Sequence, residues 1–243
     1  MAIEVFNRYE IKYLLDTETY EKVTEAVLKY MRPDKYCRDG AYYSICNIYY
    51  DTSTDEIIRK SISKPIYKEK LRLRSYGKPD GSSEAFVEIK KKFKKTVNKR
   101  RTTMTLDEAV AYLDKDIRPE GDNLNKQVLA EIDYFKQFYQ VMPKVYISYD
   151  RRAYFGIDDD SFRITFDNNI QARREDLDLT KGAYGKQLLP SGKWLMEAKI
   201  SGGTPCWFTK LLSELKLYPV SFSKYGTEYR MHLKEQIESK EKK

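Results

Sequence analysis

The chain has 243 residues, of which 41% are hydrophobic and 14% aromatic, with 21 Tyr. This content supports a packed core and excludes an intrinsically disordered protein. The net charge of +8 predicts an anionic partner, such as nucleic acid, a membrane surface or a phosphate-rich ligand, with general solubility as the plainer alternative.

Cysteine and histidine are too sparse for the chemistry that depends on them. The odd number of Cys (Cys37, Cys46 and Cys206) and the lack of CxxC spacing argue against a disulfide framework or a zinc site and fit a reducing compartment. The single His, His232, lies in a charged C-terminal stretch, so Ser-His or Cys-His catalysis is poorly supported. We see no signal peptide and no transmembrane run, and therefore expect a cytoplasmic protein, with a membrane partner left open.

The first part of the chain predicts two strands that alternate with helices. Residues 3–14 have the pattern of a strand, and a helix capped by Asp16 follows to about Met31. A second strand at 42–51 leads into a short helix near 54–62.

Hairpins dominate the middle of the chain. The segments 66–76 and 84–93 flank Gly-Lys-Pro-Asp-Gly, a strong hairpin signal, and a basic strand follows at 94–104. Helices are expected at 105–113 and 123–139.

The last part predicts another hairpin, a long loop and two helices. The expected strands are 144–155, 161–168 and 193–201, the loop is 171–192, and the helices are 205–217 and 224–239. Antiparallel hairpins with interspersed helices predict one α+β domain over 1–243, a closed antiparallel β-barrel with helices packed outside.

Charged residues occupy alternate positions in several of the predicted strands. Residues i and i+2 of a strand share a face, so each of these strands carries a charged face opposite an apolar one. Such a face is ordinarily the solvated side of a half-buried sheet. If helices cover the outside of a curved sheet, however, the charged face points inward and can bind a polyanion.

The candidate ligands of a polyanion are mainly Arg, whose planar fork matches phosphate oxygens. The main cations are Arg72, Arg74, Lys90, Arg151, Arg163 and Lys224, with Lys12, Lys199, Lys99, Arg101 and Arg8 as further candidates. Three carboxylates, Glu10, Glu88 and Glu197, could bind Mg²⁺ or Mn²⁺, which prefer oxygen ligands. Pairing with neighbouring cations is favoured for Glu10 and Glu88, and Glu197 stays open between pairing and metal binding.

The sequence has neither a P-loop nor a GxGxxG motif. Phosphoryl transfer nevertheless needs only positioning, charge neutralisation and a metal, so the lack of a histidine base is no objection.

Seven segments resemble, in order, the VTC domain, the polyphosphate polymerase domain of the vacuolar transporter chaperone complex within the triphosphate tunnel metalloenzyme (CYTH-like) superfamily. They run from residue 8 to residue 224 and are Arg8–Lys12, Lys70–Arg74, Phe86–Lys90, Tyr149–Ala153, Arg163–Asp167, Leu195–Lys199 and Ser221–Lys224.

The resemblance implies an antiparallel β-tunnel that binds a nucleoside triphosphate and a growing polyphosphate chain. It assigns phosphate binding to Lys12, Arg72, Arg74, Lys90, Arg151, Arg163 and Lys224, assistance to Tyr149 and Ser223, and the metal to Glu197. The superfamily begins with Glu-x-Glu-x-Lys, but Arg8 replaces the first Glu here. That departure favours the polymerase branch, and the lack of SPX and transmembrane regions suggests a stand-alone enzyme.

We therefore expect a metal-dependent polyphosphate polymerase that uses ATP, with Mn²⁺ or Mg²⁺ as cofactor and no specific nucleic acid as partner. A tunnel-type triphosphatase or NTPase needs the same cations and stays open. So does a non-catalytic binder of polyphosphate or nucleic acid, because basic strands interleaved with aromatic residues suit such ligands. The sequence does not decide the oligomeric state.

Overall fold

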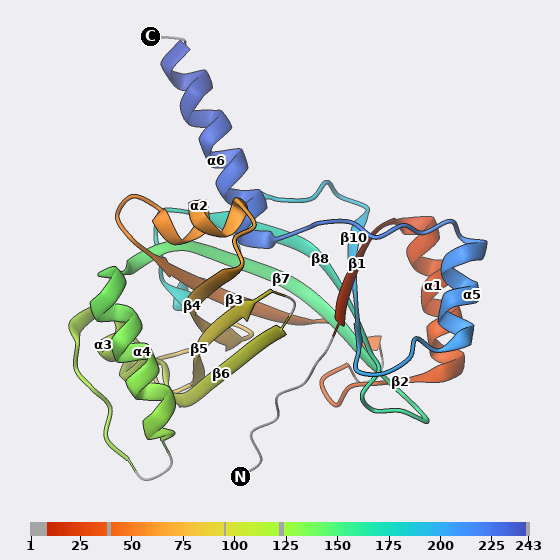
Figure 1. Cartoon of the computed structure of the whole chain (residues 1–243), viewed down its shortest axis with the longest axis horizontal. Coiled ribbons are helices and arrows are strands. Elements are labelled where there is room, and N and C mark those ends of the chain that lie inside the picture. Colours follow the sequence, from red (N-terminus) through yellow and green to blue (C-terminus); the bar gives the residue numbers. More distant parts are fainter. Residues whose placement is uncertain (1–8, 38–39, 95, 122–123, 242–243) are drawn as a thin grey trace. The chain divides into compact units, whose positions relative to one another are not determined.

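A computed structural model describes residues 9–37, 40–94, 96–121 and 124–241 (Figure 1). The strands are β1 (Tyr9–Asp16), β2 (Met31–Pro33), β3 (Tyr43–Asp51), β4 (Tyr67–Tyr76), β5 (Glu84–Phe93), β6 (Thr96–Thr105), β7 (Met142–Gly156), β8 (Arg163–Arg173), β9 (Lys186–Gln187) and β10 (Lys193–Ile200). The helices are α1 (Thr17–Tyr30), α2 (Glu56–Ile62), α3 (Leu106–Lys115), α4 (Lys126–Tyr139), α5 (Cys206–Glu214) and α6 (Lys224–Glu241), with a 3-10 helix η2 (Leu179–Lys181).

The strands form one ten-stranded sheet in the order β1-β10-β8-β7-β3-β4-β5-β6, with β2 beside β7 and β9 beside β8. Antiparallel pairing and interspersed helices confirm the predicted α+β class. Among the described residues, no backbone pairing joins β1 to β6, the two ends of this order. Closure of the barrel is therefore not confirmed.

Two compact units make up the chain. Unit 1 comprises Met1–Ser44, Tyr149–Ile170 and Leu189–Phe222, and unit 2 comprises Ile45–Ser148, Gln171–Leu188 and Ser223–Lys243. Long strands such as β7 contribute to both units, so neither unit is a continuous stretch of sequence. The expectation of one domain over 1–243 stays a prediction.

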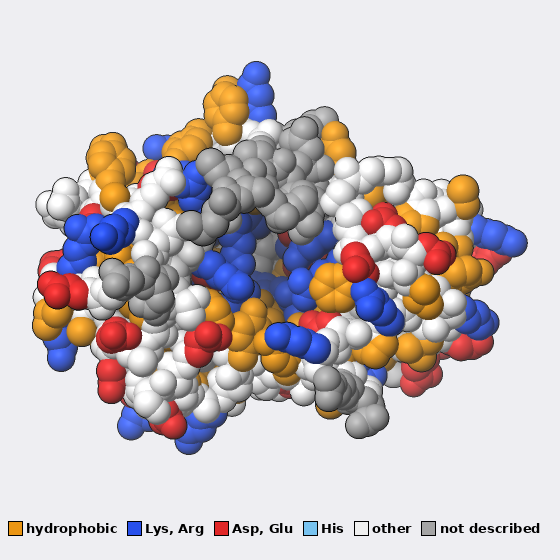
Figure 2. Space-filling model, turned by 90° about the horizontal axis from the view of Figure 1, so that it is seen from below, with side chains coloured by type: hydrophobic (Ala, Val, Ile, Leu, Met, Phe, Trp, Pro, Cys, Tyr) orange, Lys and Arg blue, Asp and Glu red, His pale blue; other side chains and the backbone are white. Residues whose placement is uncertain are grey.

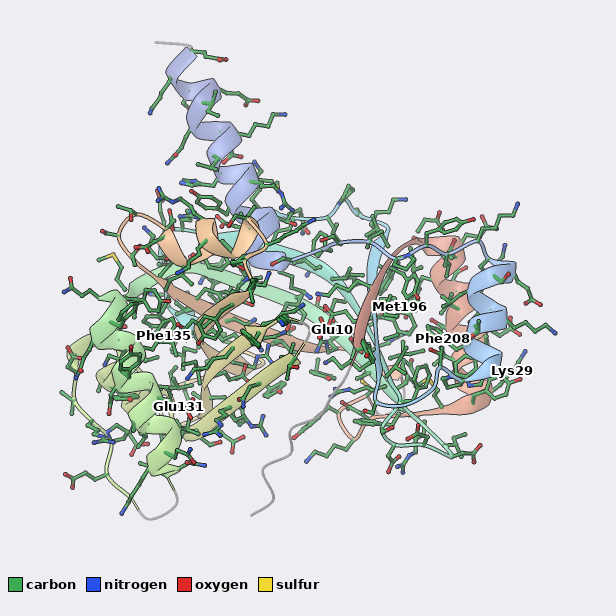
Figure 3. The ribbon with its side chains drawn as sticks, in the orientation of Figure 1. Glu10, Lys29, Glu131, Phe135, Met196 and Phe208 are labelled. Carbon is green, nitrogen blue, oxygen red and sulfur yellow. The ribbon has the colours of Figure 1, made fainter. Side chains whose placement is uncertain are left out.

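The core of unit 2 lies between the sheet and the pair α3 and α4 (Figure 1). Leu71 and Leu73 of β4 alternate with charged residues and bury their side chains completely. Phe135 of α4 lies in the same core, on the helix face opposite the solvent (Figure 3). Burying an aromatic side chain of this kind contributes about 1.5–3 kcal/mol to stability.

The core of unit 1 holds α1 and α5 against β1, β8 and β10. Val23 and Val27 lie one turn apart on one side of α1 and are fully buried. Met196 of β10 and Phe208 of α5 lie in this core (Figure 3), and Tyr30 stacks on Trp207 with ring centroids 4.6 Å apart. Each unit thus covers one sheet face with helices, which leaves the opposite face for polar side chains.

Local capping explains where the helices begin. Asp16 accepts a hydrogen bond from the Thr19 amide at 2.9 Å, as predicted. The buried Asp51 accepts hydrogen bonds from the amides of Ile57 and Ile58, at 2.8 and 2.9 Å, and so holds the first turn of α2. Asp51 therefore satisfies backbone amides at the start of α2 from outside the helix.

The segment predicted as a long loop, 171–192, is more ordered than expected. β8 continues to Arg173, and η2 and β9 follow within the segment. Arg173 donates to the carbonyls of Asp176, Asp178, Gly182 and Tyr184, which organises a backbone that has no apolar periodicity. The prediction of an irregular loop was therefore wrong in part, because the hydrogen bonds of Arg173 to four backbone carbonyls hold this segment in a defined conformation.

No helix in the described part of the chain is both long enough and apolar enough to span a bilayer.

Candidate functional site

Unit 2 presents a charged sheet face opposite its apolar core. Arg72 and Arg74 alternate with the buried Leu71 and Leu73 along β4. Glu88 lies directly opposite Arg72 on β5, so the carboxylate belongs to the same face. This pairing brings two of the predicted motifs together.

Glu88 binds three cations, and we call this group the Glu88 cluster. Its Oε2 atom lies 2.6 Å from Arg72 Nε and 3.6 Å from Arg74 Nε, and its Oε1 atom lies 2.6 Å from Lys99 Nζ. The Glu88 side chain is 1% exposed, whereas that of Lys99 is 39% exposed. One carboxylate therefore balances one of three positive charges.

Two polar residues of β3 complete the Glu88 cluster. Asn47 accepts a hydrogen bond from Arg74 Nε at 2.9 Å and donates to the carbonyl of Ile147, which fixes its orientation. The hydroxyl of Tyr49 accepts a hydrogen bond from Arg72 at 3.1 Å. Both arginines are therefore positioned from a neighbouring strand.

The excess positive charge shifts the pKa of Tyr49, Lys99 and Glu88. Burial opposes ionisation of Tyr49, but the charges of Arg72, Lys70 and Arg74 lower its pKa to about 8. Burial and the repulsion from Arg72 and Arg74 lower the pKa of Lys99 to about 7, although Glu88 acts to raise it. The same cations hold the pKa of Glu88 well below its usual range against burial. An added anion would relieve this repulsion.

Other predicted site residues of unit 2 have different surroundings. Lys90 lies opposite Lys70 and Lys99 in the strand register, and the Arg101 guanidinium lies 4.7 Å from the Phe86 ring centroid. Lys224 begins α6 and is nearly buried. Ser223 accepts a hydrogen bond from the Gly226 amide at 3.2 Å, so its hydroxyl holds the first turn of α6.

Unit 1 carries a second group of charged residues, which contains more carboxylates than the Glu88 cluster does. Lys12 of β1 lies opposite Glu197 of β10, and its Nζ atom lies 2.9 Å from Glu197 Oε1. Glu10 (labelled in Figure 3) lies 3.3 Å from the same ammonium group. Burial acts to lower the pKa of Lys12, but the two carboxylates raise it above its usual range. We call Lys12, Glu10 and Glu197, together with Arg151, Asp167, Arg163 and Lys199, the Glu197 cluster.

Arg151 links Glu197 to a carboxylate that was not among the predicted ligands. Its guanidinium donates two hydrogen bonds to Asp167, at 2.6 and 2.7 Å, and lies 3.7 Å from Glu197 Oε2. It also lies 5.1 Å from the ring centroid of Tyr149. This bidentate pair fixes the arginine in a buried position.

Arg163 and Lys199 occupy paired positions on β8 and β10. Arg163 lies 3.6 Å from Asp34 and stacks on the Phe155 ring. Burial, followed by repulsion from Arg151, lowers the pKa of Lys199 to about 8 even though Glu197 and Glu10 raise it. A bound anion would favour the protonated form here as well.

The carboxylates differ in their suitability for a divalent cation. Glu10 and Glu197 converge on one ammonium group, that of Lys12, which shows that two carboxylate oxygens can share one cationic partner. Such oxygens suit Mg²⁺ or Mn²⁺. Each oxygen of Glu88 lies 2.6 Å from an arginine or lysine nitrogen, whereas Glu197 Oε2 lies at the longer distance of 3.7 Å from Arg151. No group of three or more His, Cys, Asp or Glu with metal-binding geometry occurs within the described ranges.

Sequence reasoning missed Asn47, Tyr49 and Asp167 as members of these clusters. Asp167 shares the face of Arg163 by alternation, and Asn47 and Tyr49 alternate along β3 in the same way. That signal is weak, because polar alternation does not reveal which strand lies opposite. Arg8, a further predicted ligand, lies outside the described residues.

Figure 2 shows that Lys and Arg side chains gather in dense groups on the face that it draws, whereas Asp and Glu are mostly scattered towards its margins. On this face, basic side chains therefore form groups, as an anion-binding surface requires.

One protein family matches almost the whole chain. Its profile, described as the VTC domain, matches residues 7–233 and confirms the resemblance found in the motifs. No curated protein matches the chain in sequence.

Solved structures resemble this chain at low sequence identity. A candidate adenylate cyclase from Bacillus halodurans is 15% identical with a TM-score of 0.53, over 90% of this chain and 94% of its own. A candidate adenylyl cyclase from Hippeastrum, for which a dominant triphosphatase activity is reported, is 11% identical with a TM-score of 0.49, over 89% and 92%. At 15% identity, the similarity to the Bacillus halodurans structure shows a shared fold and does not extend to function.

We predict that Arg72→Ala and Arg74→Ala each weaken triphosphate binding by about 1.5–3 kcal/mol, because each removes a charge-assisted contact. Titration calorimetry with inorganic triphosphate measures this. Arg100→Ala is the matched control, since Arg100 pairs with Glu131 on the opposite face of the sheet. Unchanged binding in both variants, or an equal loss in the control, would contradict the assignment.

Proposed function

This chain belongs to the VTC domain family, and we propose that it is a metal-dependent polyphosphate polymerase that transfers the γ-phosphate of ATP to the end of a polyphosphate chain. The observation that carries the proposal is the Glu88 cluster, where three cations share one buried carboxylate. A phosphate chain supplies several negative charges in a row and matches this excess. The type of reaction, transfer of phosphate to a polyphosphate chain, is proposed from the family resemblance.

The proposed reaction needs little covalent chemistry from the protein. A terminal oxygen of polyphosphate attacks the γ-phosphorus of ATP, the bond from that phosphorus to the bridging oxygen breaks, and ADP leaves with the electron pair. The attacking oxygen is already ionised, so no general base is required. Arg72, Arg74 and Lys99 would hold the phosphates in line and neutralise the charge on the oxygens.

The Glu197 cluster supports the metal part of the proposal. Glu197 and Glu10 would hold Mn²⁺ or Mg²⁺, which when bound neutralises phosphate charge that the basic side chains leave uncompensated. Arg151, Arg163 and Lys199 would bind phosphates beside these carboxylates. Both oxygens of Glu88 have a cation at 2.6 Å, whereas the second oxygen of Glu197 lies at the longer distance of 3.7 Å from Arg151, so we assign Glu88 to positioning Arg72, Arg74 and Lys99.

A closed barrel, the tunnel that the family resemblance implies, also belongs to this proposal. The expected ligands are ATP and polyphosphate, recognised through their phosphates and not through the base. We therefore expect no specific nucleic acid partner, and a membrane partner stays open.

Product analysis after incubation with ATP and Mn²⁺ tests the function. Long-chain polyphosphate is the expected product, and the Arg72→Ala/Arg74→Ala double variant controls for contaminating kinases. Free phosphate without polyphosphate would instead indicate a triphosphatase of the same fold, which needs the same cations. Unchanged ATP with Mn²⁺ and with Mg²⁺ would leave only a binding protein.

We predict that Glu197→Gln abolishes turnover and keeps the fold. Lys12 retains Glu10 and Arg151 retains Asp167 in this variant, so neither cation is left unpaired. Activity with Mn²⁺, direct Mn²⁺ titration and the melting temperature are compared with those of Glu25→Gln, which removes a carboxylate from the exposed face of α1. Full activity of Glu197→Gln would reduce Glu197 to an ion-pair partner.

A further inference from the structure

The basic face of unit 2 continues past the Glu88 cluster towards one end of β4 and β5. Lys70 lies opposite Lys90 in the strand register, and Lys68 lies opposite Lys92. These residues follow Arg72 and Glu88 at intervals of two, so they share the face of the Glu88 cluster. We call Lys68, Lys92 and the neighbouring Lys64 the outer lysines.

The outer lysines carry charge that no carboxylate balances. Within the described ranges, Lys64, Lys68 and Lys92 form no ion pair with Asp or Glu, and Lys68 donates to the carbonyl of Ser61 at 3.2 Å. Burial lowers the pKa of Lys68, and the nearby charges of Lys92, Lys90 and Lys64 lower it further. Like charges directly opposite one another destabilise a sheet.

The opposite face of the same strand shows the contrast. Lys91 points away from the outer lysines and lies 2.9 Å from Glu131 of α4, which also pairs with Arg100. The chain therefore neutralises the lysine that faces its helices and leaves the outer lysines without acidic partners. A retained repulsion of this kind is typical of a site that an anionic ligand completes.

We propose that the outer lysines bind additional phosphates of a polyphosphate chain whose end lies at the Glu88 cluster, so that unit 2 discriminates long chains from triphosphate. The inference rests on the proposed function and names the part of the protein that recognises chain length. A ligand that reaches from Arg72 to Lys68 extends four residues along β4, or about 13 Å. Inorganic triphosphate is shorter than this, whereas a long chain can contact both groups.

A nucleic acid strand is the less suitable polyanion. Binding of single strands combines a basic groove with aromatic side chains on which the bases stack. Two exposed aromatic residues adjoin the outer lysines in the sequence, Tyr67 beside Lys68 and Phe93 beside Lys92, and they lie opposite each other in the strand register. Adjacent residues point to the other face of a sheet, so these rings do not share the surface of the outer lysines.

The test compares two ligands with the Lys68→Gln/Lys92→Gln double variant. We expect its affinity for long-chain polyphosphate to fall about tenfold or more and to depend less on salt, because two phosphate contacts and their released counterions are lost. Its affinity for inorganic triphosphate should stay within about twofold, since the Glu88 cluster is intact. Titration calorimetry at two salt concentrations gives both affinities.

Two further variants make the result specific. Lys22→Gln/Lys29→Gln removes the same net charge from the exposed face of α1 and should bind both ligands as the wild type does. Lys68→Arg/Lys92→Arg keeps the charge and should keep the long-chain affinity, which excludes a folding defect as the cause. Melting temperatures of all variants are measured alongside.

An equal loss for both ligands, or no loss for the long chain, would overturn the inference. So would displacement of polyphosphate by a single-stranded oligonucleotide of equal charge. Because the assay measures binding without turnover, either result leaves the product analysis with ATP as a separate test of the proposed function.

Discussion

Three cations that share one buried carboxylate are the constraint on which unit 2 depends. Glu88 is nearly inaccessible, and isolated buried charges are costly, so the carboxylate must be paired. Glu88 is paired with three cations, and the surplus of positive charge lowers the pKa of both Tyr49 and Lys99. The geometry is therefore set for a further anion, and the protein keeps this imbalance by positioning Arg72 and Arg74 from β3.

The two clusters differ in a way that suggests different tasks. In the Glu197 cluster, Arg151 has Asp167 and Lys12 has two carboxylates, so cations and anions are close to balance. In the Glu88 cluster, cations prevail. We infer that the first combines phosphate binding with a metal and that the second binds phosphates through basic side chains alone.

The alternation of charged and apolar residues along the strands made much of this arrangement predictable from the sequence. It identified Arg72 and Arg74 as residues of one strand face and Glu88, Lys12 and Glu197 as members of other charged strand faces, and the turn signal predicted the hairpin of 66–76 and 84–93 in which the structure pairs Arg72 with Glu88. The partners of each charge were harder to predict, because pairing across strands depends on register between distant segments. Asp167 therefore escaped notice, as did the carbonyl contacts by which Arg173 orders a segment without apolar periodicity.

Tyr49 reports most directly on the central claim, that the Glu88 cluster carries positive charge for a phosphate ligand. An ultraviolet titration of tyrosinate should show one tyrosine ionising near pH 8, and this step should be missing in Tyr49→Phe. Inorganic triphosphate should move the step to higher pH, because a bound anion offsets the arginine charges that favour the phenolate. A step that triphosphate leaves in place, or no ionisation near pH 8 at all, would contradict the account.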